Sequence, residues 1–353
     1  MVIEIHKMNK NQKSILILGA NGFIGNALVK DLCNDGTMKI YGMDIENNKL
    51  DHSLGNPNFV FEKGDINSSD KWIKDHIKKC DIIVPLVAIA TPNVYVKDPL
   101  KIFQLDFESN LKIIKWVAEY NKRVIFPSTS EVYGITSDKE FNEYTTNLTV
   151  GPVHKSRWIY SVSKQLLDRI IIAYGEKGLL DYTIFRPFNW IGPRLDSLKL
   201  AQLGNGRVLS IFIYNLLNNK DLIVVGDGNQ SRSFTYIDDG IDALKRIIYN
   251  SSGNDLNKKI FNIGNPDNNI NINNLAKILI EEYNKIYPKN FTGKITNQDH
   301  KIFYGEGYED IPVRVPDIRE AKKILNWAPK YDLKMSIRET LNSFIKEKEN
   351  NKL

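Results

Sequence analysis

The sequence contains few cysteines and no long apolar run. Its two cysteines, Cys33 and Cys80, cannot form a disulfide framework, and no metal-ligand spacing surrounds them. The most apolar stretch, residues 82–90, is far too short to span a bilayer. The first thirteen residues are polar and lack the apolar segment of a secretory signal. We therefore expect a soluble, cytoplasmic protein that holds no metal ion.

The composition is otherwise that of a globular protein. Hydrophobic residues make up 42% of the 353 residues and charged residues 25%, which excludes general disorder. This length allows two lobes. The formal net charge is +6, but the lysines are spread along the chain, with no basic block interleaved with aromatic residues. That distribution favours a solvated lysine-rich surface, so we expect neither a nucleic-acid nor a membrane partner.

Apolar runs alternate with helical patterns over the first half of the chain. The runs typical of buried strands are residues 14–18, 39–43, 59–62, 82–86, 123–126 and 182–185. The clearest helical patterns are residues 69–78, 99–119, 237–249, 273–287 and 335–346. The alternation predicts an α/β protein with a doubly wound parallel sheet. We expect this sheet domain at 12–188, with later segments near 232–262 packing back onto it, and a smaller mixed lobe mainly at 189–345.

Three glycines separate the first expected strand from the helix that follows it. Gly19, Gly22 and Gly25 allow a tight turn, close approach of the backbone to a pyrophosphate, and packing of the helix on the strand. The N-terminus of that helix then offers free N–H groups to the phosphates. Asp44 ends the second strand, where a carboxylate takes the adenosine ribose hydroxyls and repels the 2′-phosphate of NADP. The pattern predicts a Rossmann-type site for NAD. Further residues that we assign to this cofactor site are Asn21, Phe23, Ile24, Ile45, Asp65, Ile66 and Ala88.

Tyr160 and Lys164 lie four residues apart on an expected helix, so their side chains share one face. A free phenol has a pKa of about 10 and is a poor base at neutral pH. An adjacent ammonium and the positive nicotinamide of the oxidised cofactor both favour the phenolate. Tyr160 can then take a hydroxyl proton while hydride leaves the carbon, with both residues also contacting the cofactor. The pair predicts a dehydrogenase centre.

A hydroxyl-rich segment, residues 127–134, follows the fifth expected strand. Ligands of an open α/β sheet bind beyond the carboxyl ends of its strands, so Thr129 and Ser130 can hydrogen-bond a reacting oxygen. Glu131 directly follows these hydroxyls. Its position favours a functional glutamate over a solvated one.

Longer motifs resemble those of the UDP-glucuronic acid decarboxylase (dehydrogenase) domains of bifunctional polymyxin-resistance enzymes, which belong to the extended short-chain dehydrogenase/reductases. The motifs that carry the resemblance are residues 86–92, 127–134, 157–169, 185–196, 263–266 and 304–308. They extend over roughly residues 14–329, and we expect no formyltransferase domain like that of the bifunctional enzymes.

The resemblance implies that NAD oxidises C4 of UDP-glucuronate and that the resulting β-keto acid loses CO2 without a metal, giving UDP-4-keto-pentose and NADH. It assigns Tyr160, Lys164 and Thr129 to the oxidation. It places Ser130 and Glu131 by the departing carboxylate. Arg314 matches the proton donor to C5, where it would work through a bound water or by stabilising the enolate, because a guanidinium is a poor acid.

Substrate contacts and a dimer are also implied by the resemblance. Arginines suit a pyrophosphate because they can grip it through two hydrogen bonds. Relatives usually pair through two helices, here near 99–119 and 158–174, so a homodimer is expected. The implied contacts of the UDP-sugar are Ala90, Tyr95, Thr129, Ser130, Arg157, Asn189, Arg207, Arg232 and Tyr308.

Other functions of the same scaffold are weighed against this one. UDP-xylose synthases share the decarboxylation but return the hydride to C4, and the sequence separates them less well. UDP-apiose/UDP-xylose synthases carry cysteines where this chain has Ala90 and Ser130, so ring contraction is not expected. A non-catalytic NAD-sensing scaffold would lose Tyr160 or Lys164, and both are present. We favour release of the keto sugar because the motifs are nearest to those of the releasing enzymes.

Overall fold

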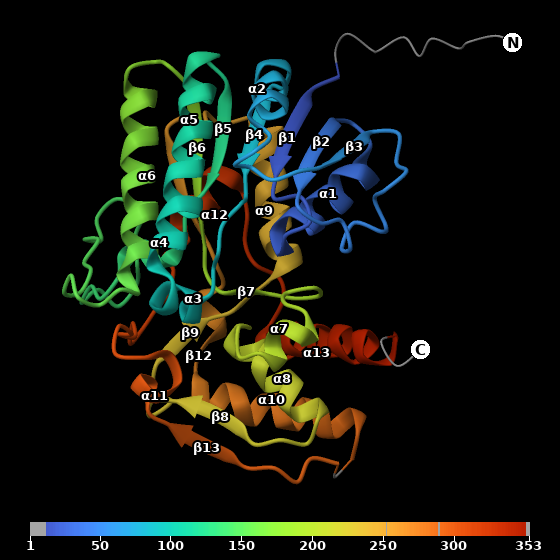
Figure 1. Cartoon of the computed structure of the whole chain (residues 1–353), viewed down its shortest axis with the longest axis vertical. Helices are drawn as coiled ribbons and strands as arrows, with labels where there is room; N and C mark the ends of the chain where they lie inside the picture. Colours follow the sequence, from blue (N-terminus) through green and yellow to red (C-terminus); the bar gives the residue numbers. More distant parts are fainter. Residues whose placement is uncertain (1–11, 252, 289, 351–353) are drawn as a thin grey trace, which may run out of the picture.

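A parallel sheet forms the larger lobe of the protein, as a computed structural model describes it for residues 12–251, 253–288 and 290–350 (Figure 1). Its seven strands lie in the order β11-β6-β5-β4-β1-β2-β3, and each pairs in parallel with its neighbours. The strands are β1 (Ser14–Leu18), β2 (Lys39–Asp44), β3 (Phe59–Lys63), β4 (Ile82–Pro85), β5 (Arg123–Pro127), β6 (Asp181–Pro187) and β11 (Lys259–Ile263). The predicted doubly wound α/β sheet is confirmed, and β11 is an additional strand that the apolar runs did not indicate.

Each face of the sheet has its own apolar core. Ile15 and Ile17 belong to one core and Leu16 and Leu18 to the other, because successive residues of a strand point to opposite faces. The helices over the first face are α1 (Phe23–Asp35), α9 (Ile237–Tyr249) and α12 (Arg319–Leu325). Those over the second face are α2 (Asp70–Lys79), α5 (Asn110–Glu119) and α6 (Trp158–Glu176).

The helix expected at 99–119 is not one continuous α-helix. It consists of α4 (Pro99–Ile102), a π-helical turn η1 (Phe103–Ser109) and then α5. The Asn110 side chain donates to the carbonyl of Leu105 at 3.1 Å and to that of Asp106 at 3.3 Å, which satisfies carbonyls of the widened turn. Apolar spacing alone does not reveal one wider turn. Such turns are frequent at functional sites.

The smaller lobe combines helices with short two-stranded sheets and packs below the carboxyl ends of the main strands (Figure 1). Its helices are α7 (Leu198–Gln202), α8 (Val208–Leu217), α10 (Ile272–Ile286), α11 (His300–Tyr304) and α13 (Leu333–Asn350). Its strands pair as β7 (Trp190–Ile191) with β10 (Thr235–Tyr236), β9 (Ser231–Ser233) with β12 (Asn269–Asn271), and β8 (Leu222–Val225) with β13 (Ile295–Gln298). Short connecting helices are α3 (Pro92–Lys97), η2 (Ser130–Tyr133) and η3 (Pro266–Asn268).

The chain passes between the lobes several times. After β9 and β10 it returns to the large lobe as α9 and β11, enters the small lobe again at α10, and returns once more as α12 (Figure 1). One apolar core accordingly includes residues of both lobes, for example Leu244 of α9 and Leu275 of α10. The domain boundaries predicted from the sequence therefore stay a prediction. In the described part of the chain, no helix is both long enough and apolar enough to cross a bilayer.

Candidate active site

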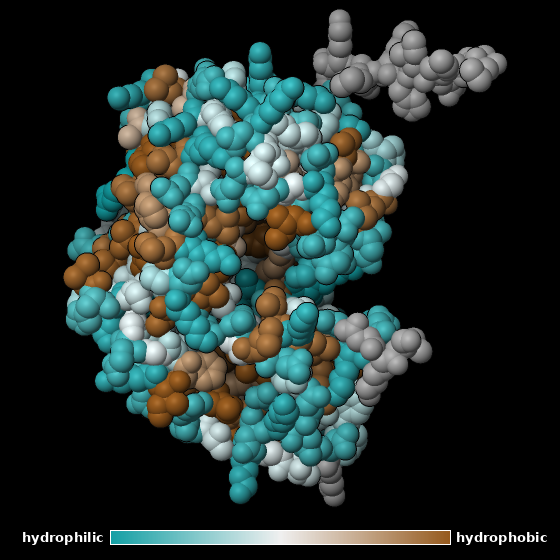
Figure 2. Space-filling model, in the orientation of Figure 1, coloured by the Kyte–Doolittle hydropathy of each residue, from teal (hydrophilic) through white to brown (hydrophobic). Residues whose placement is uncertain are grey.

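A cavity of about 350 Å³ opens between the two lobes, at the carboxyl ends of the central strands (Figure 2). Most of the site residues predicted from the sequence line it, although they come from distant parts of the chain. They are Gly19, Gly22, Phe23, Ile24, Gly25, Ala88, Ala90, Tyr95, Thr129, Ser130, Glu131, Tyr160, Lys164, Asn189, Arg207, Arg232, Tyr308 and Arg314. The predicted residues that do not line it are Asn21, Asp44, Ile45, Asp65, Ile66 and Arg157.

The turn after β1 requires glycine at two positions. A Cβ on Gly25 would lie 2.1 Å from the carbonyl oxygen of Gly19, which no side chain tolerates. Gly19 itself has a φ of +90°, and a Cβ there would lie 3.0 Å from the carbonyl carbon of Leu86. No side chain caps the helix that begins at Phe23, so its first N–H groups remain free for an anion. This bare backbone cradle fits the pyrophosphate of a dinucleotide.

Asp44 lies beside this turn, at the end of β2. Its carboxylate accepts hydrogen bonds from the backbone N–H of Asn21 at 2.9 Å and from that of Ile45 at 2.8 Å. Burial raises the pKa of Asp44, whereas these hydrogen bonds oppose the rise. The carboxylate is thus fixed in direction next to the glycine turn, which suits the ribose of an adenosine.

We expect Asp44 to set the choice between the two nicotinamide dinucleotides. The protein should use NAD⁺ at least about tenfold better than NADP⁺ in kcat/KM, or ~1.4 kcal/mol, because a carboxylate repels the 2′-phosphate. Asp44→Ala should lower this ratio of kcat/KM values towards one. Glu46→Gln is the matched control, since Glu46 is an exposed acid two residues further on. Equal use of both cofactors by the unmodified protein would remove this role from Asp44.

Tyr160 and Lys164 lie on the first turns of α6 and are almost fully buried. The Lys164 ammonium donates to the carbonyl of Pro127 at the end of β5, at 3.0 Å. The ring of Tyr160 stacks on that of Tyr95, with 4.6 Å between centroids and 10° between planes. The hydroxyl of Tyr160 is hydrogen-bonded to Thr129. The phenol is thus hydrogen-bonded to the threonine hydroxyl, and Lys164 lies one turn further along the same helix.

The charges of the chain itself oppose the phenolate that Lys164 and the nicotinamide of NAD together are expected to favour. Burial raises the pKa of Tyr160, and the negative charges of Asp106 and Glu131 raise it further, whereas the hydrogen bond with Thr129 lowers it. Burial also lowers the pKa of Lys164. Tyr160 therefore needs an additional positive charge nearby before it can act as a base. Oxidised NAD supplies such a charge, together with the acceptor for a hydride, when it is bound.

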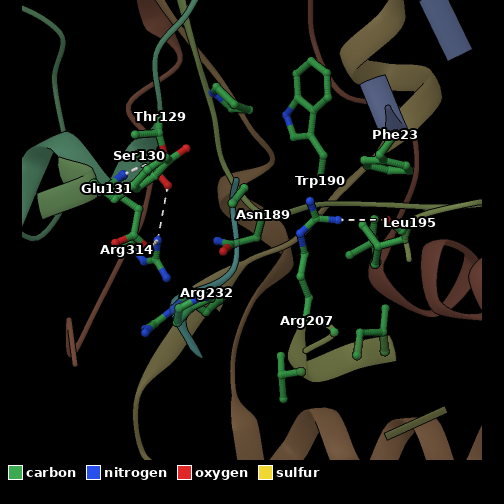
Figure 3. A pocket seen from close by; sticks show the side chains of 18 of the residues that line it. Phe23, Thr129, Ser130, Glu131, Asn189, Trp190, Leu195, Arg207, Arg232 and Arg314 are labelled. Atoms are coloured by element: carbon green, nitrogen blue, oxygen red, sulfur yellow. Dashed lines mark hydrogen bonds and ion pairs between the residues drawn. The ribbon is translucent and has the colours of Figure 1, made fainter. Parts of the chain in front are cut away.

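Glu131 lies between two buried arginines. Its Oε2 is hydrogen-bonded to Arg157 Nη2, and its Oε1 lies 2.5 Å from Arg314 Nη1. Burial alone would raise the pKa of Glu131, but these two guanidinium groups, together with that of Arg232, hold it at about 2. Arg314 Nη1 also lies 3.5 Å from the hydroxyl of Ser130, and Figure 3 shows these groups on one side of the cavity. The cluster keeps Glu131 ionised beside the catalytic hydroxyls.

Arg157 differs most from its predicted place. It was expected to contact the substrate, but it is only 2% exposed and lies behind Glu131. Its Nε and Nη1 have no hydrogen-bond partner. Arg157 thus holds Glu131 in this structure, and its contact with a substrate stays a prediction.

Two further arginines, Arg232 and Arg207, line the cavity (Figure 3). Arg232 is bound to Asp310 at 2.5 Å and to the carbonyl of Ile311 at 2.7 Å. Arg207 donates to the carbonyl of Leu195 at 3.1 Å, and its guanidinium lies 5.7 Å from the ring centroid of Phe23, at the start of α1. Guanidinium groups therefore extend from the glycine turn into the small lobe, where Asp310 pairs with Arg232 and Asp196 with Arg207. Arginines can hold a diphosphate through two hydrogen bonds.

The sequence-based prediction missed several residues of the site. Tyr304 stacks on Tyr308, with 4.2 Å between ring centroids, although only Tyr308 was assigned from that motif. Asp310 anchors Arg232 and lines the cavity. Asp106 is fully buried near Lys164, but in the sequence it is one polar residue within an expected helix. The adjacent motif could have indicated Tyr304, whereas nothing in the sequence distinguished Asp106.

The fold, the glycine turn and the tyrosine–lysine pair define an NAD-binding enzyme of the short-chain dehydrogenase type. The chain belongs to the NAD dependent epimerase/dehydratase family, whose sequence profile matches residues 15–264. This membership confirms the predictions of an enzyme and of NAD as its cofactor.

Individual relatives show which members of this family the chain is similar to. The chain is 52% identical over 350 residues to the bifunctional polymyxin resistance protein ArnA of Wigglesworthia glossinidia brevipalpis, in a match that covers 98% of this chain and 53% of that protein. The chain thus spans about half the length of this relative, and the resemblance to bifunctional polymyxin-resistance enzymes is confirmed. PbgP3 from Burkholderia pseudomallei has 41% identity and a TM-score of 0.82, with 94% of this chain and 96% of that chain covered. MoeE5, solved in complex with UDP-glucuronic acid and NAD, has a TM-score of 0.75 at 20% identity, with 94% and 99% covered, and shows the shared fold.

Proposed function

We propose that this protein is an NAD-dependent UDP-glucuronate decarboxylase. The enzyme oxidises C4 of the sugar, the oxidised sugar loses C6 as CO2, and UDP-4-keto-pentose is released with NADH. The main support is Arg314, which lines the cavity beside the hydroxyl of Ser130, 3.5 Å from its Nη1. A guanidinium in the wall of the cavity suits the carboxylate of a uronic acid.

In the oxidation, Tyr160 takes the proton of the C4 hydroxyl, and NAD, which the glycine turn and Asp44 would hold, would supply the acceptor for the hydride of C4. Thr129, which is hydrogen-bonded to Tyr160, orients that hydroxyl. Lys164 lies one helical turn from Tyr160, and its ammonium is fixed by the carbonyl of Pro127. General-base catalysis of this kind contributes about 10²- to 10⁴-fold.

In the decarboxylation, the new C4 ketone lies β to the carboxylate. The C5–C6 bond breaks, its electron pair moves to form the enolate at C4 and C5, and CO2 leaves. Arg314 is close enough to Glu131 and Ser130 to stabilise the negative charge before and after this step. A proton then returns to C5 through Arg314 or a water that it holds, and the neutral ketone is restored. Arg207 and Arg232 hold the diphosphate throughout.

The test is a reaction of purified protein with UDP-glucuronate and NAD⁺, followed by absorbance of reduced nicotinamide and by product mass. We expect one NADH and one CO2 for each UDP-4-keto-pentose. UDP-xylose as the main product, without accumulation of NADH, would assign the protein to the redox-neutral synthases. Binding of NAD without turnover would indicate a non-catalytic scaffold. UDP-glucose is the control substrate, since it carries no carboxylate to lose.

We also propose that the protein is a cytoplasmic homodimer that pairs through α5 and α6. Val162 and Leu166 support this pairing, because they are four residues apart on α6 and are 41% and 44% exposed. An exposed apolar stripe on a helix often marks an interface. Light scattering should give twice the chain mass, and Val162→Asp with Leu166→Asp should give monomers. A monomeric unmodified protein would contradict this pairing.

A further inference from the structure

Asp106 is a buried carboxylate that the proposed reaction does not use. It lies on the π-helical turn η1 and has no exposed surface. Its Oδ1 accepts a hydrogen bond from the backbone N–H of Ile89 at 2.9 Å, but its Oδ2 is buried without any hydrogen-bond partner. Burying a carboxylate with one unpaired oxygen is costly unless a positive charge compensates.

The described residues form no ion pair with the Asp106 carboxylate, and Lys164 is the group whose charge compensates it over a longer distance. Among the described residues, it is the one whose charge opposes the effect of burial on Asp106. Lys164 in turn is influenced by two carboxylates, those of Asp106 and Asp168. Asp168 already has a cation of its own, because Arg186 Nη2 lies 3.1 Å from its Oδ2. Asp106 is therefore left as the counter-ion of Lys164.

The other charges around the pair are balanced within their own cluster. Glu131, which acts on Tyr160 and Tyr95, is bound to two arginines. The positive Arg207 acts on Tyr160 from the small lobe. Tyr95 and Tyr160 are the remaining titratable neighbours, and the charge of Asp106 raises the pKa of both. Burial raises the pKa of Asp106 to about 7, so its charge changes close to neutral pH.

The backbone holds Asp106 in this position from two sides. The hydrogen bond with Ile89 ties its side chain to the loop after β4 that lines the cavity at Ala88 and Ala90. Asn110 ties the same loop through the carbonyl of Val87, at 3.1 Å. The widened turn η1 packs against α6, which carries Lys164. The carboxylate is thus fixed between the cavity loop and the catalytic helix.

We propose that Asp106 is the counter-ion that keeps Lys164 protonated in the buried site, and that it thereby sets the pH range in which Tyr160 and Lys164 work. Asp106 is a positioning residue, since its effect on the substrate passes through Lys164 and Tyr160. Its catalytic part rests on the proposed function, whereas the pairing of the two charges does not.

The first experiment compares the pH dependence of kcat/KM for the unmodified protein, Asp106→Asn and Asp106→Ala. Asparagine keeps an acceptor for the N–H of Ile89 but removes the charge. Loss of a negative charge lowers the pKa of both Tyr160 and Lys164, so both limbs of the profile should move to lower pH, by about one unit. If Asp106 only anchors the loop, Asp106→Asn superposes on the unmodified profile and Asp106→Ala alone is impaired. That result would overturn the proposal.

The second experiment measures thermal unfolding and needs no substrate. Lys164→Met should lower the melting temperature because it leaves Asp106 buried without a cation. Adding Asp106→Asn to Lys164→Met should restore most of this loss, so the effects of the two changes are not additive. Additive effects would show that the two charges do not interact, and would also overturn the proposal. If UDP-glucuronate is not turned over at all, the proposed function fails, while this cycle still reports on the pair.

Discussion

Tyr160→Phe should reduce kcat for the formation of NADH from UDP-glucuronate by about 10²- to 10⁴-fold. The change removes one oxygen and keeps the ring, so the stack on Tyr95 and the burial of the side chain are preserved. Without the phenol no group accepts the C4 hydroxyl proton, and oxidation precedes every later step. Decarboxylation is therefore lost with it, although Glu131 and Arg314 are intact.

Initial rates of NADH formation and of CO2 release check this expectation on the same samples. Binding of UDP-glucuronate, measured by calorimetry, should change little, so the loss lies in kcat and not in affinity. Tyr174→Phe is the matched control, because Tyr174 is a half-buried tyrosine on the same helix outside the cavity. A Tyr160→Phe protein within tenfold of the unmodified rate would mean that another residue is the base.

Glu131→Gln uncouples the two halves of the reaction and destabilises the protein. Reduction of NAD⁺ should continue while release of CO2 slows, so a 4-keto acid accumulates and can be detected by mass. The same change leaves two buried guanidinium groups without their carboxylate. Breaking a buried ion pair by removing one partner costs about 3–5 kcal/mol of unfolding free energy.

The pH dependence of the unfolding free energy separates the contribution of the Glu131 ion pairs from the rest of the stability that Glu131→Gln loses. The pKa of Glu131 is about 2 in the folded protein, below its ordinary value of 4.5. A depressed pKa contributes stability that is present above the unfolded value and is lost as the pH falls towards about 2. Denaturant unfolding should therefore show a large difference between the unmodified protein and Glu131→Gln at pH 7, and a smaller one near pH 3. An equal difference at both pH values would mean that Glu131 stabilises the fold by shape alone.

The sheet could be predicted from the sequence because its parallel strands are buried on both faces. A strand such as β1, with Ile15 to Leu18 fully or almost fully buried, has to be apolar throughout and stands out as a run. β11 joins the sheet from far along the chain, and the polar Asn262 before its last residue breaks the apolar run. The widened turn η1 leaves no mark, because one extra residue in a turn barely alters the spacing of apolar side chains.

The part of the site at the carboxyl ends of the strands could be predicted, because these ends lie at the same edge of the sheet. Three residues that line the cavity, Gly19, Thr129 and Asn189, come just after the carboxyl ends of strands of the sheet. Arg314 comes from the small lobe, so only the resemblance to a family indicated it. The pairing of Arg157 with Glu131 depends on side-chain directions from two separate elements, α6 and η2, which motif spacing does not contain.

The pairing of β11 with β6 limits how this protein can be divided. A fragment that ended at Pro187 would contain the glycine turn, Tyr160 and Lys164, yet it would present β6 as an unprotected edge, because residues 259–263 hydrogen-bond along it in the complete chain. It would also lack α9 and α12, which cover one face of the sheet. Exposed strand edges and apolar faces recruit other chains. We therefore expect such a fragment to aggregate when it is expressed alone, although it contains the whole glycine turn.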